Sequence, residues 1–299
     1  MENLLPVPVT EEEPLATVLS TLRMKRLNDH TFEGSNLRQF ANRVYGGQVF
    51  AQAVIAARAT LHGELANRQI HSITAAFLRR GDMQVPTRLE VEDVLDSRSF
   101  STRRVIAYQG DSQIFSARAS FQEVQPGVEH ESPAPTAPAP DTLQSSVDFF
   151  AALDIPDARR MNSTNAVDIR HVDGPIWIRP QKEPSTSTLI WFRLRSPMPA
   201  QSSQLLHRAM LAYATDQFML EPVMRAHGMF WLNKEMSVAT LDHAIWWHRD
   251  VDMSHWILAE LTSPSAQGGR GLAVARYFQD GVHIATMAQE GMVRIRSVQ

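Results

Sequence analysis

One stretch in the second half of the chain constrains the fold more than any other, residues 236–249, which read MSVATLDHAIWWHR. Apolar, β-branched and aromatic residues run through it without glycine or proline, which predicts one long strand, mostly covered on both faces. A threonine, an aspartate and a histidine are set into this strand. A buried polar group without a partner costs about 1–3 kcal/mol. These three residues are therefore either structural hydrogen-bonding groups or part of a site.

The two halves of the chain repeat one order of elements. The sequence of the first half predicts a short helix over 14–26 and a short strand over 28–34. A helix over 48–61 follows, and then strand-like segments over 70–78, 87–109 and 113–122. The second half predicts short strands over 165–171 and 175–180, a strand over 187–195, a long helix over 201–224, the strand over 236–249, and strands over 256–262, 271–278 and 282–292. One helix followed by a run of antiparallel strands, present twice, predicts an α+β fold of two tandem domains.

An internal alignment supports the duplication. At an offset of 169 residues, Tyr108 pairs with Tyr277 and Asp111 with Asp280 in two hairpin turns. A repeat of this length indicates two copies of one domain, because solenoid repeats have periods of about 20–50 residues. The offset also predicts which residues of the first half correspond to any site in the second.

A proline-rich segment divides the halves. Residues 125–141 read QPGVEHESPAPTAPAPD, a composition that cannot build a core and that favours an extended chain. We therefore expect an N-terminal domain over 1–124, a linker over 125–143 and a C-terminal domain over 144–299.

Composition narrows the class of protein. The 299 residues contain no cysteine, which excludes disulfides and thiolate catalysis and fits a reducing compartment, so we expect a cytoplasmic protein. The formal charge is -3 and the basic residues are scattered, so no nucleic-acid partner is indicated. No apolar run approaches the ~20 residues needed to span a membrane.

The long predicted helix carries one acid among apolar residues. Six positions that advance by three or four residues share one face, namely Leu205, Ala209, Ala212, Asp216, Met219 and Val223. An aspartate held in such a place can orient and partly deprotonate a water molecule. The alternative is that Asp216 lies at the margin of the apolar face and is solvated.

Motifs spread over nearly the whole chain resemble the acyl-CoA thioesterase II family, which has a double hotdog fold. They are Arg43-Val44-Tyr45-Gly46-Gly47-Gln48, Phe77-Leu78-Arg79-Arg80-Gly81-Asp82, Ser99-Phe100-Ser101-Thr102-Arg103-Arg104, Ala239-Thr240-Leu241-Asp242-His243, Trp246-Trp247-His248-Arg249 and Gln289-Glu290-Gly291. The chain departs from the family at Arg80, where proline is usual. The resemblance implies two hotdog domains, each with a long central helix wrapped by an antiparallel sheet, and an enzyme that hydrolyses fatty acyl-CoA.

The resemblance also implies the site. It places an aspartate, a threonine and a glutamine that together position the attacking water on Asp216, Thr240 and Gln289. Hotdog enzymes commonly use a backbone N–H at the start of the central helix for the oxyanion, which here is the Gly46-Gly47 turn, although a plain tight turn is equally compatible. No metal or cofactor is implied, and a homo-oligomer is expected. Three arginines are candidates to bind the coenzyme phosphates, namely Arg103, Arg249 and Arg270. The alternative for each is an ordinary solvated charge on the surface.

Two other functions remain open at this point. A hotdog protein could bind acyl-CoA without turnover, as a sensor. A hotdog hydratase or dehydratase would need a histidine paired with an acid, and no histidine lies near Asp216 in the sequence. The offset of 169 maps the three proposed catalytic positions onto Gly47, His71 and Ser120, a set without an acid, which predicts one working site per chain.

Overall fold

The computed structural model describes residues 3–38, 43–233 and 235–295, and the chain forms one antiparallel sheet of 12 strands in the order β1-β2-β4-β5-β6-β3-β9-β12-β11-β10-β8-β7. The strands are β1 (Lys25–Asn28), β2 (Thr31–Gly34), β3 (Gln69–Phe77), β4 (Thr87–Asp96), β5 (Phe100–Gln109), β6 (Ser112–Gln122), β7 (Val167–His171), β8 (Ser187–Leu194), β9 (Met236–Trp247), β10 (Ile257–Gln267), β11 (Arg270–Gln279) and β12 (Val282–Ile295). Strands β3 and β9 pair at the centre, with Ile73 opposite Ile245. The two halves therefore share one continuous sheet.

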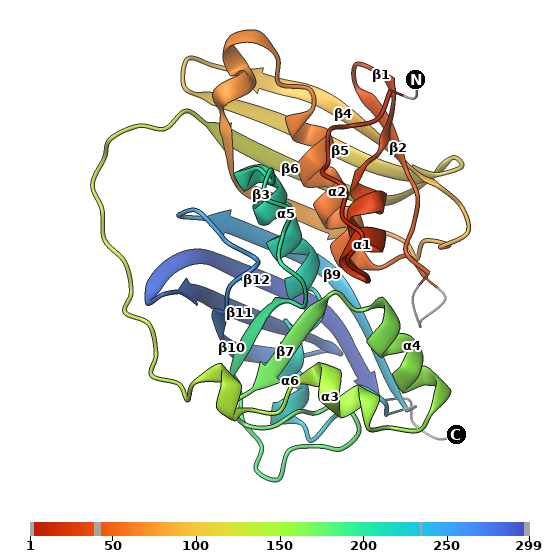
Figure 1. Ribbon diagram of the computed structural model, residues 1–299, viewed down its shortest axis with the longest axis vertical. Coiled ribbons are helices and arrows are strands. Elements are labelled where there is room, and N and C mark those ends of the chain that lie inside the picture. The colour runs from red at the N-terminus through yellow and green to blue at the C-terminus, as the bar shows by residue number, and fades with distance from the viewer. Residues whose placement is uncertain (1–2, 39–42, 234, 296–299) are drawn as a thin grey trace.

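The helices cover one face of this sheet (Figure 1). They are α1 (Leu15–Leu22), α2 (Gly46–Arg58), α3 (Ser146–Ala151), α4 (Pro156–Thr164), α5 (Gln204–Thr215) and α6 (Glu221–Ala226), with short 3-10 turns at Gly63–Asn67 and Pro140–Thr142. Helix α2 is almost wholly buried because its inward positions carry small alanines, which let the strands and α5 approach closely. The predicted α+β class, with one central helix and an antiparallel sheet in each half, is confirmed.

The central helix of the second half is shorter than predicted. Helix α5 ends at Thr215, Asp216 is its C-terminal cap, and α6 starts only at Glu221. The prediction of one helix over 201–224 was therefore wrong. Pro222 lies in the first turn of α6, where its missing N–H is tolerated, whereas inside a continuous helix it would remove a hydrogen bond to the preceding turn. Asp216 consequently lies at a helix end, not in the middle of an apolar face.

Two strand predictions also need correction. The segment 87–109 forms two strands, because Ser97 closes a turn in which its N–H donates to the carbonyl of Phe100 at 2.9 Å. The segment 175–180 forms no strand, although Ile176 and Trp177 accept backbone hydrogen bonds from residues 231 and 232. Proline at both of its ends removes the donors that a strand would need. Helices α3 and α4 were not anticipated.

The duplication is real, but its offset is 170 residues. The N–H of Asp82 donates to Gln109 Oε1 at 2.7 Å, and the N–H of Asp252 donates to Gln279 Oε1 at 2.9 Å, so the two halves make the same contact 170 positions apart. The offset of 169 was wrong because it matched Tyr108, on the outer face under Arg88, with the fully buried Tyr277. In a strand, a slip of one residue moves every side chain to the opposite face.

Strand β9 is covered on one face only. Asp242 and Trp246 are exposed on the outer face, so the prediction of a strand covered on both faces was wrong. A bulge opposite the Glu290/Gly291 step interrupts the pairing of β9 with β12 near Leu241. Thr240 and His243, three residues apart, therefore both face the helices, which strand alternation alone would not allow.

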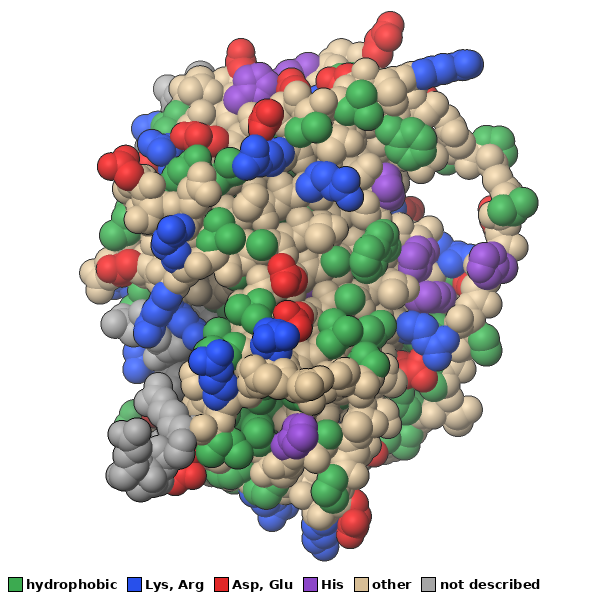
Figure 2. Space-filling view, turned by 180° about the vertical axis from the view of Figure 1, so that it is seen from behind, with side chains coloured by type: hydrophobic (Ala, Val, Ile, Leu, Met, Phe, Trp, Pro, Cys, Tyr) green, Lys and Arg blue, Asp and Glu red, His purple; other side chains and the backbone are tan. Residues whose placement is uncertain are grey.

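The proline-rich segment 123–139 contains no helix or strand and passes along the outside of the molecule (Figure 1). It contacts the second half where Glu131 pairs with Arg249 at 3.1 Å and where Trp191 Nε1 donates to the carbonyl of Pro138 at 2.9 Å. Figure 2 shows the opposite side of the molecule, where acidic and basic side chains are interspersed. In the described part of the chain, no helix is long and apolar enough to cross a membrane. The domain limits at 124 and 144 stay a prediction.

Candidate active site

The Asp216 carboxylate collects hydrogen bonds from three parts of the fold. Its Oδ2 accepts from the backbone N–H of Gly47 at 2.8 Å. Its Oδ1 accepts from Thr240 Oγ1 at 3.1 Å and from Gln289 Nε2 at 3.3 Å. The three residues that the sequence picked out, separated by up to 73 positions, thus meet at one carboxylate together with the predicted glycine turn.

Neighbouring strands place the threonine and the glutamine. Thr240 on β9 and Gln289 on β12 both point toward the helices, and Gln289 Nε2 also donates to Thr240 Oγ1 at 2.9 Å. The Thr240 hydroxyl therefore accepts from the amide while it donates to the carboxylate. Gln289 is 1% exposed, whereas Asp216 and Thr240 remain partly accessible. One side of the group is therefore fixed in the core, and the other side is partly accessible.

The first half contributes the start of α2. A side chain at Gly47 would place its Cβ 2.5 Å from the carbonyl oxygen of Tyr213, so only glycine lets α2 approach α5 this closely. The Tyr45 hydroxyl donates to the same carbonyl at 2.6 Å. Gly46 lies beside the carboxylate as well, since its Cβ would be 2.7 Å from Asp216 Oδ2. The Gly46-Gly47 turn is thus the start of a helix that packs against the acid. The alternative of a plain tight turn does not account for these contacts.

The surroundings of Asp216 act on its charge in opposite directions. Burial raises the pKa of the carboxyl, while the hydrogen bonds from Thr240, Gly47 and Gln289 and the positive charge of Arg43 pull the pKa down without cancelling the rise. Arg43 itself is exposed, and burial of part of its side chain and the charge of Arg80 lower its pKa. One arginine, Arg43, therefore acts on the charge of the acid, and sequence reasoning had not selected it for the site.

The arrangement suits activation of water. A carboxylate with a raised pKa is a better proton acceptor than an ordinary aspartate, and a hydroxyl and an amide beside it can hold the oxygen of a water molecule. The N-terminus of α2 adds backbone N–H groups and the positive end of a helix dipole, which favour a developing negative charge. Among the described residues, no group of three or more His, Asp or Glu side chains is arranged to hold a metal ion.

The corresponding place in the first half is apolar. An offset of 170 maps Thr240 onto Ile70 and Gln289 onto Ala119, which are 1% and 0% exposed. The offset of 170 holds for the strands but not for the helices. Asp216 is the C-terminal cap of α5, and the residue in the same place on α2 is Ala59. The earlier mapping was shifted by one position at His71 and Ser120, and at Gly47 it failed because the helices do not share the spacing of the strands. His71 bonds Ser120 through Nε2 at 2.8 Å, and His71 is the bulged residue that matches Leu241.

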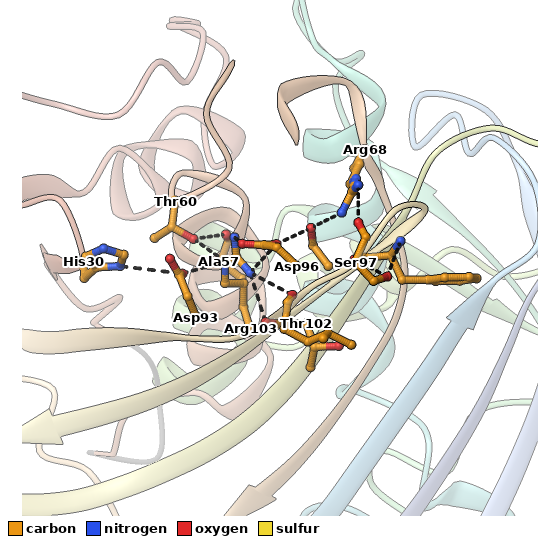
Figure 3. A network of polar contacts seen from close by, with 12 residues as sticks. His30, Ala57, Thr60, Arg68, Asp93, Asp96, Ser97, Thr102 and Arg103 are labelled. Atoms are coloured by element: carbon orange, nitrogen blue, oxygen red, sulfur yellow. Dashed lines mark hydrogen bonds and ion pairs between the residues drawn. The ribbon is translucent and has the colours of Figure 1, made fainter. Parts of the chain in front are cut away.

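The arginines considered for coenzyme phosphates have other partners. Arg103 is 1% exposed and is held by Thr60, Asp93 and Asp96, as Figure 3 shows. Burial would raise the pKa of Asp96, but its bonds to Arg103 and Ser101 bring the pKa below its usual value. Arg103 therefore braces β5 against the end of α2. The other two arginines pair with acids, Arg249 with Glu131 and Arg270 with Glu290.

Comparisons with known proteins agree with this architecture. The family described as acyl-CoA thioesterase matches residues 180–292, and its N-terminal domain family matches residues 36–122. Acyl-coenzyme A thioesterase 8 of Homo sapiens is 32% identical over 93% of this chain and 89% of its own length. Acyl-CoA thioesterase 2 of Haemophilus influenzae is 33% identical over 94% of this chain and 98% of its own length.

Solved structures lead to the same family. The acyl-CoA thioesterase II TesB2 of Mycobacterium marinum is 32% identical, covers 95% of this chain and 99% of its own, and superposes with a TM-score of 0.75. A hot dog fold protein of Alicyclobacillus acidocaldarius, 18% identical, covers 93% of this chain and 98% of its own with a TM-score of 0.73 and shows the fold alone. The predicted double hotdog is thereby confirmed, and this chain belongs to the acyl-CoA thioesterase family.

Proposed function

We propose that Asp216, Thr240 and Gln289 hold the water with which this acyl-CoA thioesterase hydrolyses fatty acyl-CoA to free fatty acid and coenzyme A. The observation that carries the proposal is the convergence of Thr240 Oγ1 and Gln289 Nε2 on the same oxygen of the Asp216 carboxylate. Two polar side chains from neighbouring strands and a carboxylate from a helix end make a three-point holder for one small molecule. Such positioning supplies a large part of the rate of a bimolecular reaction.

In the proposed reaction, Asp216 accepts a proton from the water while the water oxygen attacks the thioester carbonyl carbon. The carbonyl oxygen becomes an oxyanion, for which the N–H groups of Gly46 and Gly47 at the start of α2 are the donors. The intermediate collapses, the carbon–sulfur bond breaks, and the proton on Asp216 passes to the coenzyme A thiolate. No bond to the enzyme forms. The Gly47 N–H donates to the Asp216 carboxylate in this structure, and protonation of Asp216 weakens that bond and makes the N–H available to the oxyanion.

The other two functions have less support. A hydratase or dehydratase needs a histidine beside its acid, and the hydrogen-bond partners of Asp216 in the described chain are a glycine N–H, a threonine and a glutamine. A sensor that only binds acyl-CoA has no need of a buried acid with a raised pKa. We also infer one working site per chain, because Ala59, Ile70 and Ala119 occupy the equivalent place in the first half.

Three further expectations belong to this proposal. We expect domains over 1–124 and 144–299, a cytoplasmic location and a homo-oligomer. The proline content of residues 125–141 supports the first, and the lack of cysteine supports the second. Gel filtration with light scattering measures the third.

A thiol-release assay over a panel of acyl-CoA chain lengths tests the proposal. Wild type should release thiol, while Thr240→Val and Gln289→Leu, which keep side-chain volume, should lose most of it. Thr74→Val is the matched control, since Thr74 is exposed on the outer face of β3 and should tolerate the change. Thiol release by both site variants at the rate of wild type would overturn the assignment. No thiol from any substrate, with tight binding of some, would favour the sensor.

A further inference from the structure

His243 is a buried histidine that the proposed reaction leaves without a task. It is 0% exposed, and its ring stacks on Phe50 of α2 with ring centres 4.7 Å apart. Neither Nδ1 nor Nε2 has a hydrogen-bond partner among the described residues. A neutral imidazole carries one N–H donor and one acceptor nitrogen, and leaving such groups unpaired in a core is costly. A packing role alone does not account for a polar ring at this position.

Gln289 of the site also has a buried polar atom without a hydrogen-bond partner among the described residues. Gln289 lies directly opposite His243 in the pairing of β9 with β12, and both side chains face the helices. Side chains paired in this way have Cβ atoms about 4.5–5.5 Å apart. Gln289 Nε2 is engaged by Asp216 and Thr240, but its Oε1 is buried with no partner among the described residues. Unsatisfied atoms of complementary kind thus lie on adjacent strands beside the catalytic group.

The orientation of the Gln289 amide matters for the reaction. The amide nitrogen must face Asp216, because the amide oxygen in that place would repel the carboxylate and leave Thr240 Oγ1 without its donor. The bonds from Nε2 to Asp216 and Thr240 hold the amide from one side only and leave it some freedom to rotate. A donor that binds Oε1 from the other side would remove that freedom.

We propose that His243 is a positioning residue, whose ring N–H donates through one buried water molecule to Gln289 Oε1 and so holds the amide nitrogen toward Asp216. The inference rests on the proposed function of Asp216, Thr240 and Gln289. Burial lowers the pKa of His243 to about 3, so the ring stays neutral over the working range and keeps one donor and one acceptor. Stacking on Phe50 fixes the plane of the ring and therefore the direction of its N–H.

Substitution by phenylalanine separates this role from packing. His243→Phe keeps the ring and its stacking and removes both nitrogens, so it should fold with an unfolding temperature at least equal to that of wild type. We expect kcat to fall by about 10- to 100-fold with little change in KM, since a small misplacement of a catalytic group can cost about 100-fold. His243→Gln, which restores a donor, should recover part of kcat. His248→Phe, just beyond the same strand and exposed, is the matched control.

A double-mutant cycle shows whether His243 acts through Gln289. In the Gln289→Ala background, His243→Phe should change kcat less than two-fold, because no amide remains to be oriented. Equal losses in both backgrounds, or wild-type kcat in His243→Phe, would overturn the proposal. If Asp216→Asn also kept wild-type activity, the proposed function itself would fail instead.

A measurement on the wild-type protein covers the case in which His243→Phe does not fold. Nitrogen-15 NMR of histidine-labelled enzyme should show His243 as a neutral tautomer whose N–H proton is hydrogen-bonded and slow to exchange. A ring N–H without a hydrogen bond would contradict the proposed water bridge.

Discussion

Substitution of Gly47 by alanine would test how closely the two helices must meet. The new Cβ would lie 2.5 Å from the carbonyl oxygen of Tyr213, whereas ordinary contacts start near 3.4 Å, so α2 and α5 must separate by about 0.9 Å. The obstacle is backbone on a buried helix, which cannot swing aside. The N–H of Gly47, now 2.8 Å from Asp216 Oδ2, would move out of hydrogen-bond range by the same displacement.

Two effects on stability compete in this variant. Alanine in place of glycine favours a helix by about 0.5–1 kcal/mol, whereas overpacking of a tight contact costs about 1–3 kcal/mol. The second is larger, so we expect Gly47→Ala to lower the free energy of unfolding by about 1–2 kcal/mol. Because a displacement near 1 Å can cost about 100-fold in rate, we expect kcat to fall by one to two orders of magnitude.

The assay combines thiol release at saturating acyl-CoA with unfolding in urea. Gly127→Ala is the control, because nothing lies within 4 Å of the Cβ it would add and its backbone can accept alanine. It should match wild type in both measurements. Gly47→Ala with wild-type kcat and unchanged stability would refute the close approach of the helices and the role of this N–H in the site.

Three other outcomes follow from the same structure. The value of kcat/KM should fall as pH decreases, because protonated Asp216 cannot accept a proton, and burial should place the midpoint above the ordinary 3.8; a midpoint at or below 3.8 would contradict the raised pKa. Limited proteolysis should cut first between residues 125 and 141, and the fragments should stay together through the pairing of β3 with β9; fragments that separate without denaturant would show independent halves. His71→Ala should keep most activity in the thiol-release assay, while a variant that lost it would place chemistry in the first half.

Sequence reasoning reached the main residues of the site but not the way they meet. Asp216, Thr240 and Gln289 were predicted from motif resemblance, and the structure brings them within hydrogen-bond distance. The contact between Gly47 and Asp216 joins residues 169 positions apart. The pattern of neighbouring residues in the sequence does not predict which helix ends will lie in contact. The charge of Arg43 near Asp216 was missed for the same reason.

The remaining errors concern backbone detail. Alternation in a strand places residues three apart on opposite faces, so Thr240 and His243 could not be assigned to one face without the bulge near Leu241. A break before α6 was readable in principle, because Pro222 stood inside the predicted helix. The offset of 169 matched residue types, whereas the true offset of 170 preserves which face each side chain occupies.

Titration of Asp216→Asn with intact acyl-CoA tests the central claim most directly. The substitution keeps the shape of the side chain and removes the proton acceptor, which is worth about 10²–10⁴-fold in rate, so the substrate itself can serve as the ligand. We predict one binding equivalent per chain by calorimetry and almost no thiol released during the titration. Two equivalents per chain, or thiol release at the rate of wild type, would contradict a single water-activating site built on Asp216.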